Sequence, residues 1–95
     1  MPVFSYEYPK AILDILQDAK PVEPGRHHGN STEGSMYLFR GKAGRFIVHL
    51  RHEREAPVPA VRLMQLPDEV TDAESIQYAQ AHPEAFSRWY MTYLQ

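Results

Sequence analysis

The sequence contains no cysteine among its 95 residues. This absence excludes disulfide bonds, thiolate metal ligands and cysteine nucleophiles, and it suits a reducing compartment. The uninterrupted apolar runs are only a few residues long, whereas a membrane-spanning helix needs about 20. No basic segment followed by an apolar stretch opens the chain, so we expect no signal peptide, no membrane partner and a cytoplasmic location.

The charge that is present is distributed unevenly along the chain. The net charge is −2, yet residues 26–54 carry six basic and two acidic residues, which gives this segment +4 and the remainder −6. Four of the five histidines also lie in this segment. Charge asymmetry indicates the kind of partner rather than the fold. We therefore expect a partner with an anionic surface.

The first third of the chain is predicted to be a helix followed by a loop. Over residues 9–20 apolar side chains recur at three and four positions, with polar side chains between them. This spacing is typical of an amphipathic helix. Residues 21–34 are rich in glycine and proline and have no hydrophobic period. They predict a long flexible loop.

The middle of the chain predicts three strands. Residues 35–40 and 45–54 alternate around a glycine-containing turn at 41–44, which predicts a hairpin, and 61–65 predict a third strand. On the second hairpin strand, one face carries Phe46, Val48 and Leu50 and is predicted to be core. The opposite face is predicted to be mostly exposed to water, and its members are Arg45, Ile47, His49, Arg51 and Glu53.

The last quarter predicts two helical segments. Thr71 and Glu74 have capping-box spacing before a helix over 72–81, and Pro83 can begin a second, aromatic-rich segment. We therefore predict one small globular α+β domain over 1–95. It would have an N-terminal helix, an antiparallel β-hairpin plus a third strand, and two C-terminal helical segments packed on one sheet face. This order resembles the double-stranded-RNA-binding topology, which small RNase toxins also use.

The basic, histidine-rich hairpin and the loop before it are the predicted partner-binding surface. Positive charge interleaved with aromatic rings can hold phosphates and stack on bases. The alternative is an ordinary solvated sheet face whose lysines and arginines discourage edge pairing. The predicted partner-binding residues are Arg26, His27, His28, Tyr37, Arg40, Lys42, Arg45, His49 and Arg51.

Three functions fit this surface. The leading hypothesis is a small non-enzymatic regulatory or inhibitor protein, of bacterial or phage type, that docks on a larger protein or nucleoprotein. A second is an RNA- or DNA-binding module that uses the same surface, although the sequence pI of about 6.2 is low for one. A third is a small metal-independent RNase that uses His49, Arg51 and Glu53 as acid, phosphate clamp and base.

No catalytic or cofactor motif appears in the sequence, so we assign no catalytic residues and no cofactor. No recognised metal-ligand spacing connects the histidines, so we predict no metal site. The aromatic residues of the last segment are predicted to be mostly core. Any part that the sheet leaves uncovered would support a homodimer, with Trp89, Tyr90 and Tyr93 as its contact residues.

Overall fold

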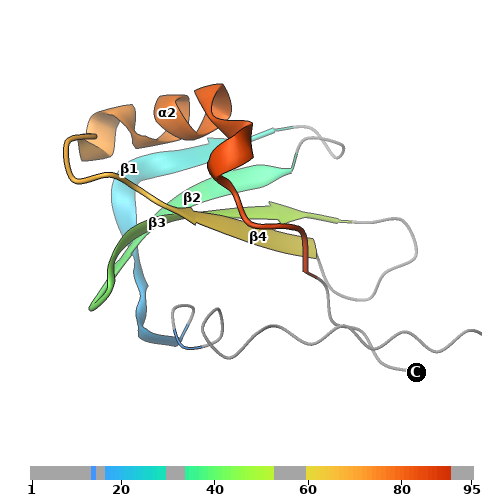
Figure 1. The fold of residues 1–95 in the computed structure, drawn as a ribbon, viewed down its shortest axis with the longest axis horizontal. Helices are drawn as coiled ribbons and strands as arrows, with labels where there is room; N and C mark the ends of the chain where they lie inside the picture. Colours follow the sequence, from blue (N-terminus) through green and yellow to red (C-terminus); the bar gives the residue numbers. More distant parts are fainter. Residues whose placement is uncertain (1–13, 15–16, 30–33, 53–59, 91–95) are drawn as a thin grey trace, which may run out of the picture.

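A four-stranded antiparallel sheet forms the larger part of the fold (Figure 1). The computed structural model describes residues 14, 17–29, 34–52 and 60–90. The strands lie side by side in chain order, and a short helix follows the last of them. The elements are β1 Lys20–His28, β2 Ser35–Gly41, β3 Gly44–Arg51, β4 Ala60–Gln65, the 3-10 turn η1 Asp72–Glu74, α2 Ser75–Ala81 and the 3-10 turn η2 Pro83–Ala85.

The predicted hairpin and third strand are confirmed. β2 pairs with β3 from Ser35 opposite Leu50 to Gly41 opposite Gly44, and β3 pairs in turn with β4. Gly44 has a φ of 125°, a backbone conformation that residues with a side chain rarely adopt. The glycine therefore suits the turn that sets the register of the hairpin.

The first strand occupies residues that the sequence assigned to a flexible loop, so the loop prediction for 21–34 is wrong in its first part. Among the described strands, β1 pairs with β2, and its register shifts between Pro21 and Arg26. Edge strands and bulges are the places where a sheet accepts proline, which has no N–H to donate. The irregular register also hides the strand, because it breaks the two-residue alternation that would have indicated one.

The predicted fold class is wrong. The described structure is mostly sheet, with four strands instead of three, and the short α2 is the one α-helix that follows the described strands. Much of the helix predicted over 9–20 lies outside the described residues. Within it, Asp14, Gln17 and Asp18 have helical backbone, but Lys20 already begins β1. The likeness to the double-stranded-RNA-binding topology therefore does not hold.

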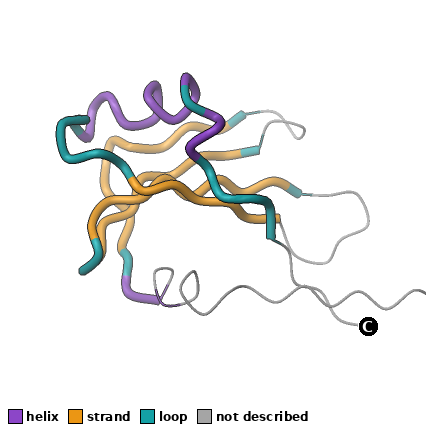
Figure 2. Tube along the Cα trace, viewed as in Figure 1, coloured by secondary structure: helices purple, strands orange, loops and turns teal. Residues whose placement is uncertain are grey.

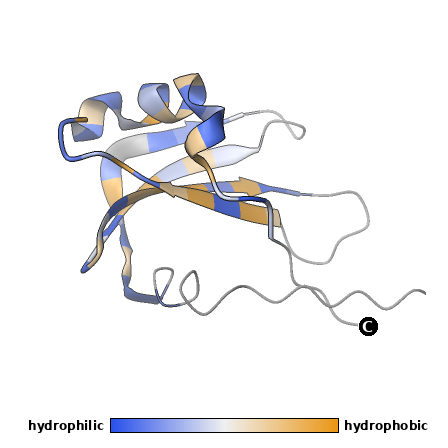
Figure 3. Cartoon of the chain, viewed as in Figure 1, coloured by the Kyte–Doolittle hydropathy of each residue, from blue (hydrophilic) through white to orange (hydrophobic). Residues whose placement is uncertain are grey.

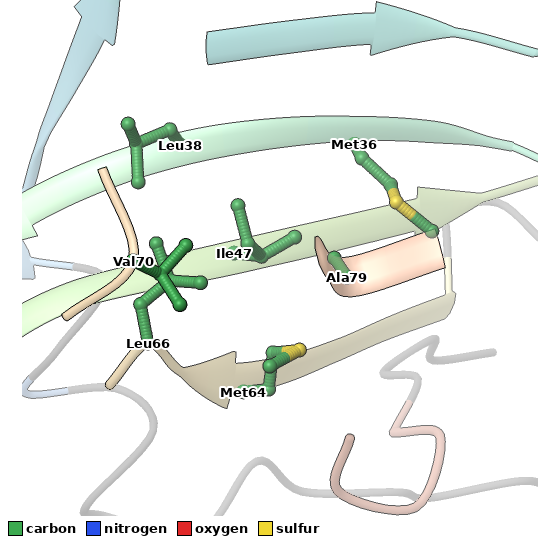
Figure 4. Close-up of a cluster of buried hydrophobic side chains, with 7 residues drawn as sticks. All are labelled: Met36, Leu38, Ile47, Met64, Leu66, Val70 and Ala79. Carbon is green, nitrogen blue, oxygen red and sulfur yellow. The ribbon is translucent and has the colours of Figure 1, made fainter. Parts of the chain in front are cut away.

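Both faces of the sheet contain buried apolar clusters. On the face that α2 covers, the cluster joins three strands to the helix side (Figure 4), and its members are Met36, Leu38, Ile47, Met64, Leu66, Val70 and Ala79. A second cluster lies on the opposite face and consists of Phe46, Val48, Val61 and Leu63. Figure 3 shows β4 as mostly hydrophobic with a few hydrophilic bands, which agrees with the burial of residues on both of its faces.

The helix covers the sheet face that was predicted to be exposed. Ile47 is fully buried beneath it, and the side chains of this face were expected to meet water. Alternation along a strand determines which side chains share a face, but not which face receives a helix. The other face, with the buried Phe46 and Val48, is the more apolar one on β3, so the sequence pattern favoured the wrong face for the helix.

The predicted capping box is confirmed. The Glu74 N–H donates to Thr71 Oγ1, and the Thr71 N–H donates to Glu74 Oε1, each at 3.3 Å. The helix predicted over 72–81 is present as η1 followed by α2. It stops at His82, and Pro83 begins only a single 3-10 turn.

The prediction of a second C-terminal helix is wrong for residues 86–90, which are not helical. Phe86 has extended backbone, with φ −74° and ψ 150°. The Tyr90 N–H donates to the Val61 carbonyl at 2.7 Å, and the Val61 N–H donates to the Tyr90 carbonyl at 2.6 Å. This segment follows the outer edge of β4 as a loop (Figure 2). The unpaired backbone groups of a sheet edge favour an extended partner over a helix.

The burial of Ile47 gives a direct test of which sheet face lies under the helix. We expect Ile47→Ala to lower the free energy of unfolding by about 2–5 kcal/mol, since it leaves a cavity in the core. Urea unfolding followed by circular dichroism measures this change. Gln77→Ala, at an exposed position of α2, is the control and should stay within about 0.5 kcal/mol of the wild type. A similarly small effect for Ile47→Ala would contradict the described packing.

Candidate functional site

Two of the predicted partner-binding arginines form ion pairs within the molecule. Arg40 and Arg45 lie opposite each other on β2 and β3. Arg40 Nη2 donates to Asp72 Oδ2 and Arg45 Nη1 donates to Asp72 Oδ1, each at 2.8 Å. Arg45 Nη2 also donates to the Pro67 carbonyl at 3.0 Å, and only 15% of the Arg45 side chain is exposed. The charge of the hairpin is thus partly neutralised by the acidic flank of the same chain.

The two arginines also lower the pKa of the Asp72 carboxyl group. The hydrogen bond from Arg45 is the largest effect that holds the pKa of Asp72 below its ordinary value of 3.8, and Arg40 adds a second hydrogen bond. Both positive charges act in the same direction, whereas desolvation acts in the opposite one and is outweighed. Asp72 is therefore a carboxylate at neutral pH, and the group of three side chains has a net charge of +1.

The other predicted residues near the hairpin and β1 do not form a continuous basic surface. Lys42 lies exposed in the turn. Arg26 is 3.7 Å from the Glu23 carboxylate, and both side chains are mostly exposed, so this pair contributes little. His28 and Tyr37 meet edge to face, with their ring centroids 5.5 Å apart.

The expectation that Arg45, His49 and Arg51 form one outward-facing cationic surface is not met. The three share a sheet face, but it is the face that α2 covers. Arg45 is bound to Asp72, and His49 is only 5% exposed. Arg51 lies at the far end of β3, where it lines a cavity. Whether the predicted residues bind a partner stays a prediction.

That cavity has a volume of about 460 Å³ and lies where β3 ends and β4 begins. Its lining comes from all four strands, from α2 and from the segment 86–90, and it includes Gly34, which directly precedes β2. Among the described residues that line it, none is acidic. We call it the arginine–tryptophan cavity, and its lining residues are His27, Gly34, Met36, His49, Arg51, Arg62, Gln80 and Trp89.

A partly buried hydrogen bond fixes the histidine His49, which lines the cavity. Arg62 lies opposite His49 in the β3–β4 register, and its Nε donates to His49 Nδ1 at 3.0 Å. A nitrogen that accepts a hydrogen bond carries no proton, so this geometry assigns a neutral imidazole with its proton on Nε2. Gly34 has a φ of 82°, and a Cβ there would clash with the Leu50 carbonyl oxygen and lie 3.1 Å from His49 Nε2. Glycine therefore lets the backbone pass close to β3 and to the His49 ring.

The indole of Trp89 stacks against the cationic side chains. The guanidinium carbon of Arg51 is 4.2 Å from the ring centroid, and that of Arg62 is 4.7 Å from it. The His49 ring is 4.9 Å away. A guanidinium over an indole is stabilised by about 0.5–1 kcal/mol when exposed and by about 2 kcal/mol or more when desolvated. Trp89 thus holds two like charges at one wall of the cavity.

Backbone hydrogen bonds on both sides hold Trp89 in place. The Ser87 N–H donates to the Leu63 carbonyl at 2.8 Å, and the Leu63 N–H donates to Ser87 Oγ at 3.2 Å. On the other side of Trp89, Tyr90 pairs with Val61. The indole is therefore positioned by the edge of β4 and does not depend on its ring contacts alone.

The environment of Arg62 disfavours its positive charge. Burial lowers the pKa of Arg62 from its ordinary value, and the nearby charge of Arg51 lowers it further. A guanidinium nevertheless stays protonated in proteins. A negatively charged group in the cavity would offset both the burial and the repulsion, so the arrangement is chemically suited to an anion.

The residues predicted for self-association have contacts within the chain. Trp89 lines the cavity, and Tyr90 pairs with β4 and packs against the second apolar cluster. Both side chains are half-buried. Tyr93 lies outside the described residues. Self-association stays a prediction.

Three of the predicted partner-binding residues are brought together by the fold: His27, His49 and Arg51. Sequence analysis missed Arg62 and Gln80 as cavity residues. Alternation in the third strand does place Arg62 on the other face of the sheet from its chain neighbours Val61 and Leu63. Its pairing with His49 follows only from the β3–β4 register, which the sequence does not specify.

Among the described residues, no group of three or more histidine or acidic side chains is close enough to hold a metal ion. Within the same residues, no helix has the length and hydrophobicity needed to cross a bilayer. No protein-family model matches this sequence, and no curated protein and no solved structure matches it. Function is therefore inferred from the geometry of the site.

The ion pairs of Asp72 predict a specific pH dependence of stability. A carboxylate whose pKa is lowered by folding stabilises the protein above its unfolded pKa, and this contribution is lost as the pH falls through the folded pKa. Asp72→Asn should therefore lower the urea midpoint at pH 7. The difference from the wild type should shrink as the pH falls below about 4.

Urea midpoints of the wild type and Asp72→Asn over a pH series measure this effect. The control is Glu69→Gln, an exposed carboxylate just before η1. A difference between wild type and Asp72→Asn that stays constant from pH 7 down to pH 2 would contradict the assigned role of the two arginines.

Proposed function

We propose that this protein is a non-enzymatic binding module that takes an anionic group of its partner into the arginine–tryptophan cavity. The observation that supports it best is that two guanidinium groups, those of Arg51 and Arg62, both lie close to the Trp89 ring centroid, at 4.2 and 4.7 Å. The partner is a larger protein or nucleoprotein with an anionic surface, and the role is regulatory or inhibitory. The absence of cysteine suits a cytoplasmic location.

The electrostatics of the cavity support an anionic ligand. Two like charges near one ring repel each other, and burial of Arg62 adds a desolvation cost. A carboxylate or phosphate can accept two parallel hydrogen bonds from one guanidinium, and such charge-assisted bonds are stronger than neutral ones. His49 adds no further charge because its Nδ1 accepts from Arg62.

The hairpin turn is a weaker candidate than the cavity. Arg40 and Arg45 share the carboxylate of Asp72, so a partner at the turn would compete with an existing ion pair. Lys42 is the remaining basic residue of the turn, and a single exposed lysine gives little specificity. The opposite end of the same sheet face, where the cavity lies, is therefore the better-supported binding surface.

Catalysis by His49, Arg51 and Glu53 is less well supported than binding. His49 is buried and its Nδ1 accepts a hydrogen bond from Arg62, so this nitrogen is not available to a substrate. A general acid or base has to lie within hydrogen-bond reach of the reacting group. Glu53 lies outside the described residues.

Anion binding can be measured through the intrinsic fluorescence of Trp89, because it is the chain's single tryptophan. Titration with inorganic phosphate at low ionic strength should give a saturable change in emission. Arg62→Gln keeps an N–H donor for His49 but removes the charge, so it should weaken binding roughly tenfold or more.

Lys20→Gln, which removes an exposed cation at the start of β1, is the matched control and should bind as the wild type does. Far-ultraviolet circular dichroism shows whether each variant is folded, and Arg51→Gln provides a second charge removal at the same ring. No saturable change in the wild type, or equal losses for Arg62→Gln and Lys20→Gln, would refute the proposal.

A further inference from the structure

The arginine–tryptophan cavity has more chemical features than a simple anion needs. Arg51 and Arg62 supply positive charge, and Trp89 supplies a flat aromatic wall. Met36 adds an apolar side chain, and Gln80 adds an amide that can both donate and accept hydrogen bonds. A phosphate ion alone would use only the guanidinium groups. The other three side chains suit a ligand that also contains a planar, partly apolar and hydrogen-bonding part.

Planar groups are arranged for stacking at one wall of this cavity. The two guanidinium carbons lie 4.2 and 4.7 Å from the Trp89 centroid. Indole rings and guanidinium planes are the surfaces on which proteins stack unpaired bases. Trp89 lines the cavity and is half-buried. A base that joins this stack would have its phosphate within reach of the guanidinium groups.

We propose that the ligand of the cavity is a nucleotide unit, a phosphate joined through its sugar to an unpaired base. This inference rests on the proposed anion-binding function and specifies its ligand. The unit is either a free nucleoside monophosphate or one residue of a single-stranded nucleic acid. The volume of about 460 Å³ lies within the range of small-molecule sites, roughly 300–1,000 Å³.

The charge of the whole chain agrees with such a local contact. A net charge of −2 gives no long-range attraction to a polyanion, and a protein that follows many phosphates is usually basic. A single nucleotide needs only the positive charge of the cavity itself. A duplex does not fit, because its bases are paired and stacked and cannot reach the Trp89 ring.

A ligand series followed by Trp89 fluorescence tests the inference, with excitation where the bases do not absorb. The probes are ribose 5-phosphate, a nucleoside monophosphate, a phosphoserine peptide, and a short oligonucleotide in single-stranded and duplex form. Base stacking is worth about 1–3 kcal/mol, so the monophosphate should bind roughly 5- to 150-fold more tightly than ribose 5-phosphate.

A variant at the stacking wall separates base recognition from phosphate recognition. Trp89→Leu removes the fluorophore, so its binding is measured by isothermal titration calorimetry. It should lose the preference for the monophosphate over ribose 5-phosphate, whatever its affinity for the sugar phosphate. Tyr78→Leu, an aromatic substitution on α2 away from the cavity lining, should retain that preference. Circular dichroism confirms that both variants are folded.

The outcomes distinguish this inference from the function on which it rests. Equal affinity for ribose 5-phosphate and the monophosphate would overturn the nucleotide inference and leave anion binding in place. No binding of any phosphate compound would overturn both. Tighter binding of the phosphoserine peptide or of the duplex would also overturn the inference. Tighter binding of the single strand than of the monophosphate supports a nucleic-acid source, and equal binding supports a free nucleotide.

Discussion

The ion pairs of Asp72 with Arg40 and Arg45 connect the hairpin to the helical part of the chain. Because α2 begins three residues after Asp72, these pairs help to hold the helix over the face that contains Ile47. They also partly neutralise the positive charge near the hairpin turn with a carboxylate of the same chain. The cationic side chains that gather around a cavity are consequently those at the other end of the same face.

At that end, the sheet register acts together with two aromatic rings, Trp89 and Phe86, which lies 4.2 Å from the Arg62 guanidinium carbon. The β3–β4 register places Arg62 beside His49, and Trp89 holds the guanidinium groups of Arg51 and Arg62 near each other. Each contact is modest by itself. Together they produce a wall that is flat, positive and partly desolvated, with Gln80 nearby. This combination of properties, rather than the total charge of the chain, is what favours a small anionic and aromatic ligand.

Local patterns predicted the elements whose signals are local. The hairpin, the third strand and the capping box at Thr71 were found because alternation, glycine positions and cap spacing determine them. β1 was missed because its register shift removes the alternation. The last segment has aromatic side chains at helical spacing, yet pairing with Val61 makes Tyr90 extended. Charge alone indicated His27, His49 and Arg51, whereas Arg62 required long-range register.

Trp89, which forms one wall of the arginine–tryptophan cavity, comes after all the described strands and after α2 in the chain. The meander of β1 to β4 is built from neighbouring segments, so it can form before the segment 86–90 docks on β4. Along the sequence, Trp89 is therefore separate from the strands that supply most of the cavity lining. Substitutions at this one position can change the aromatic wall of the cavity while the sheet that supports it stays intact.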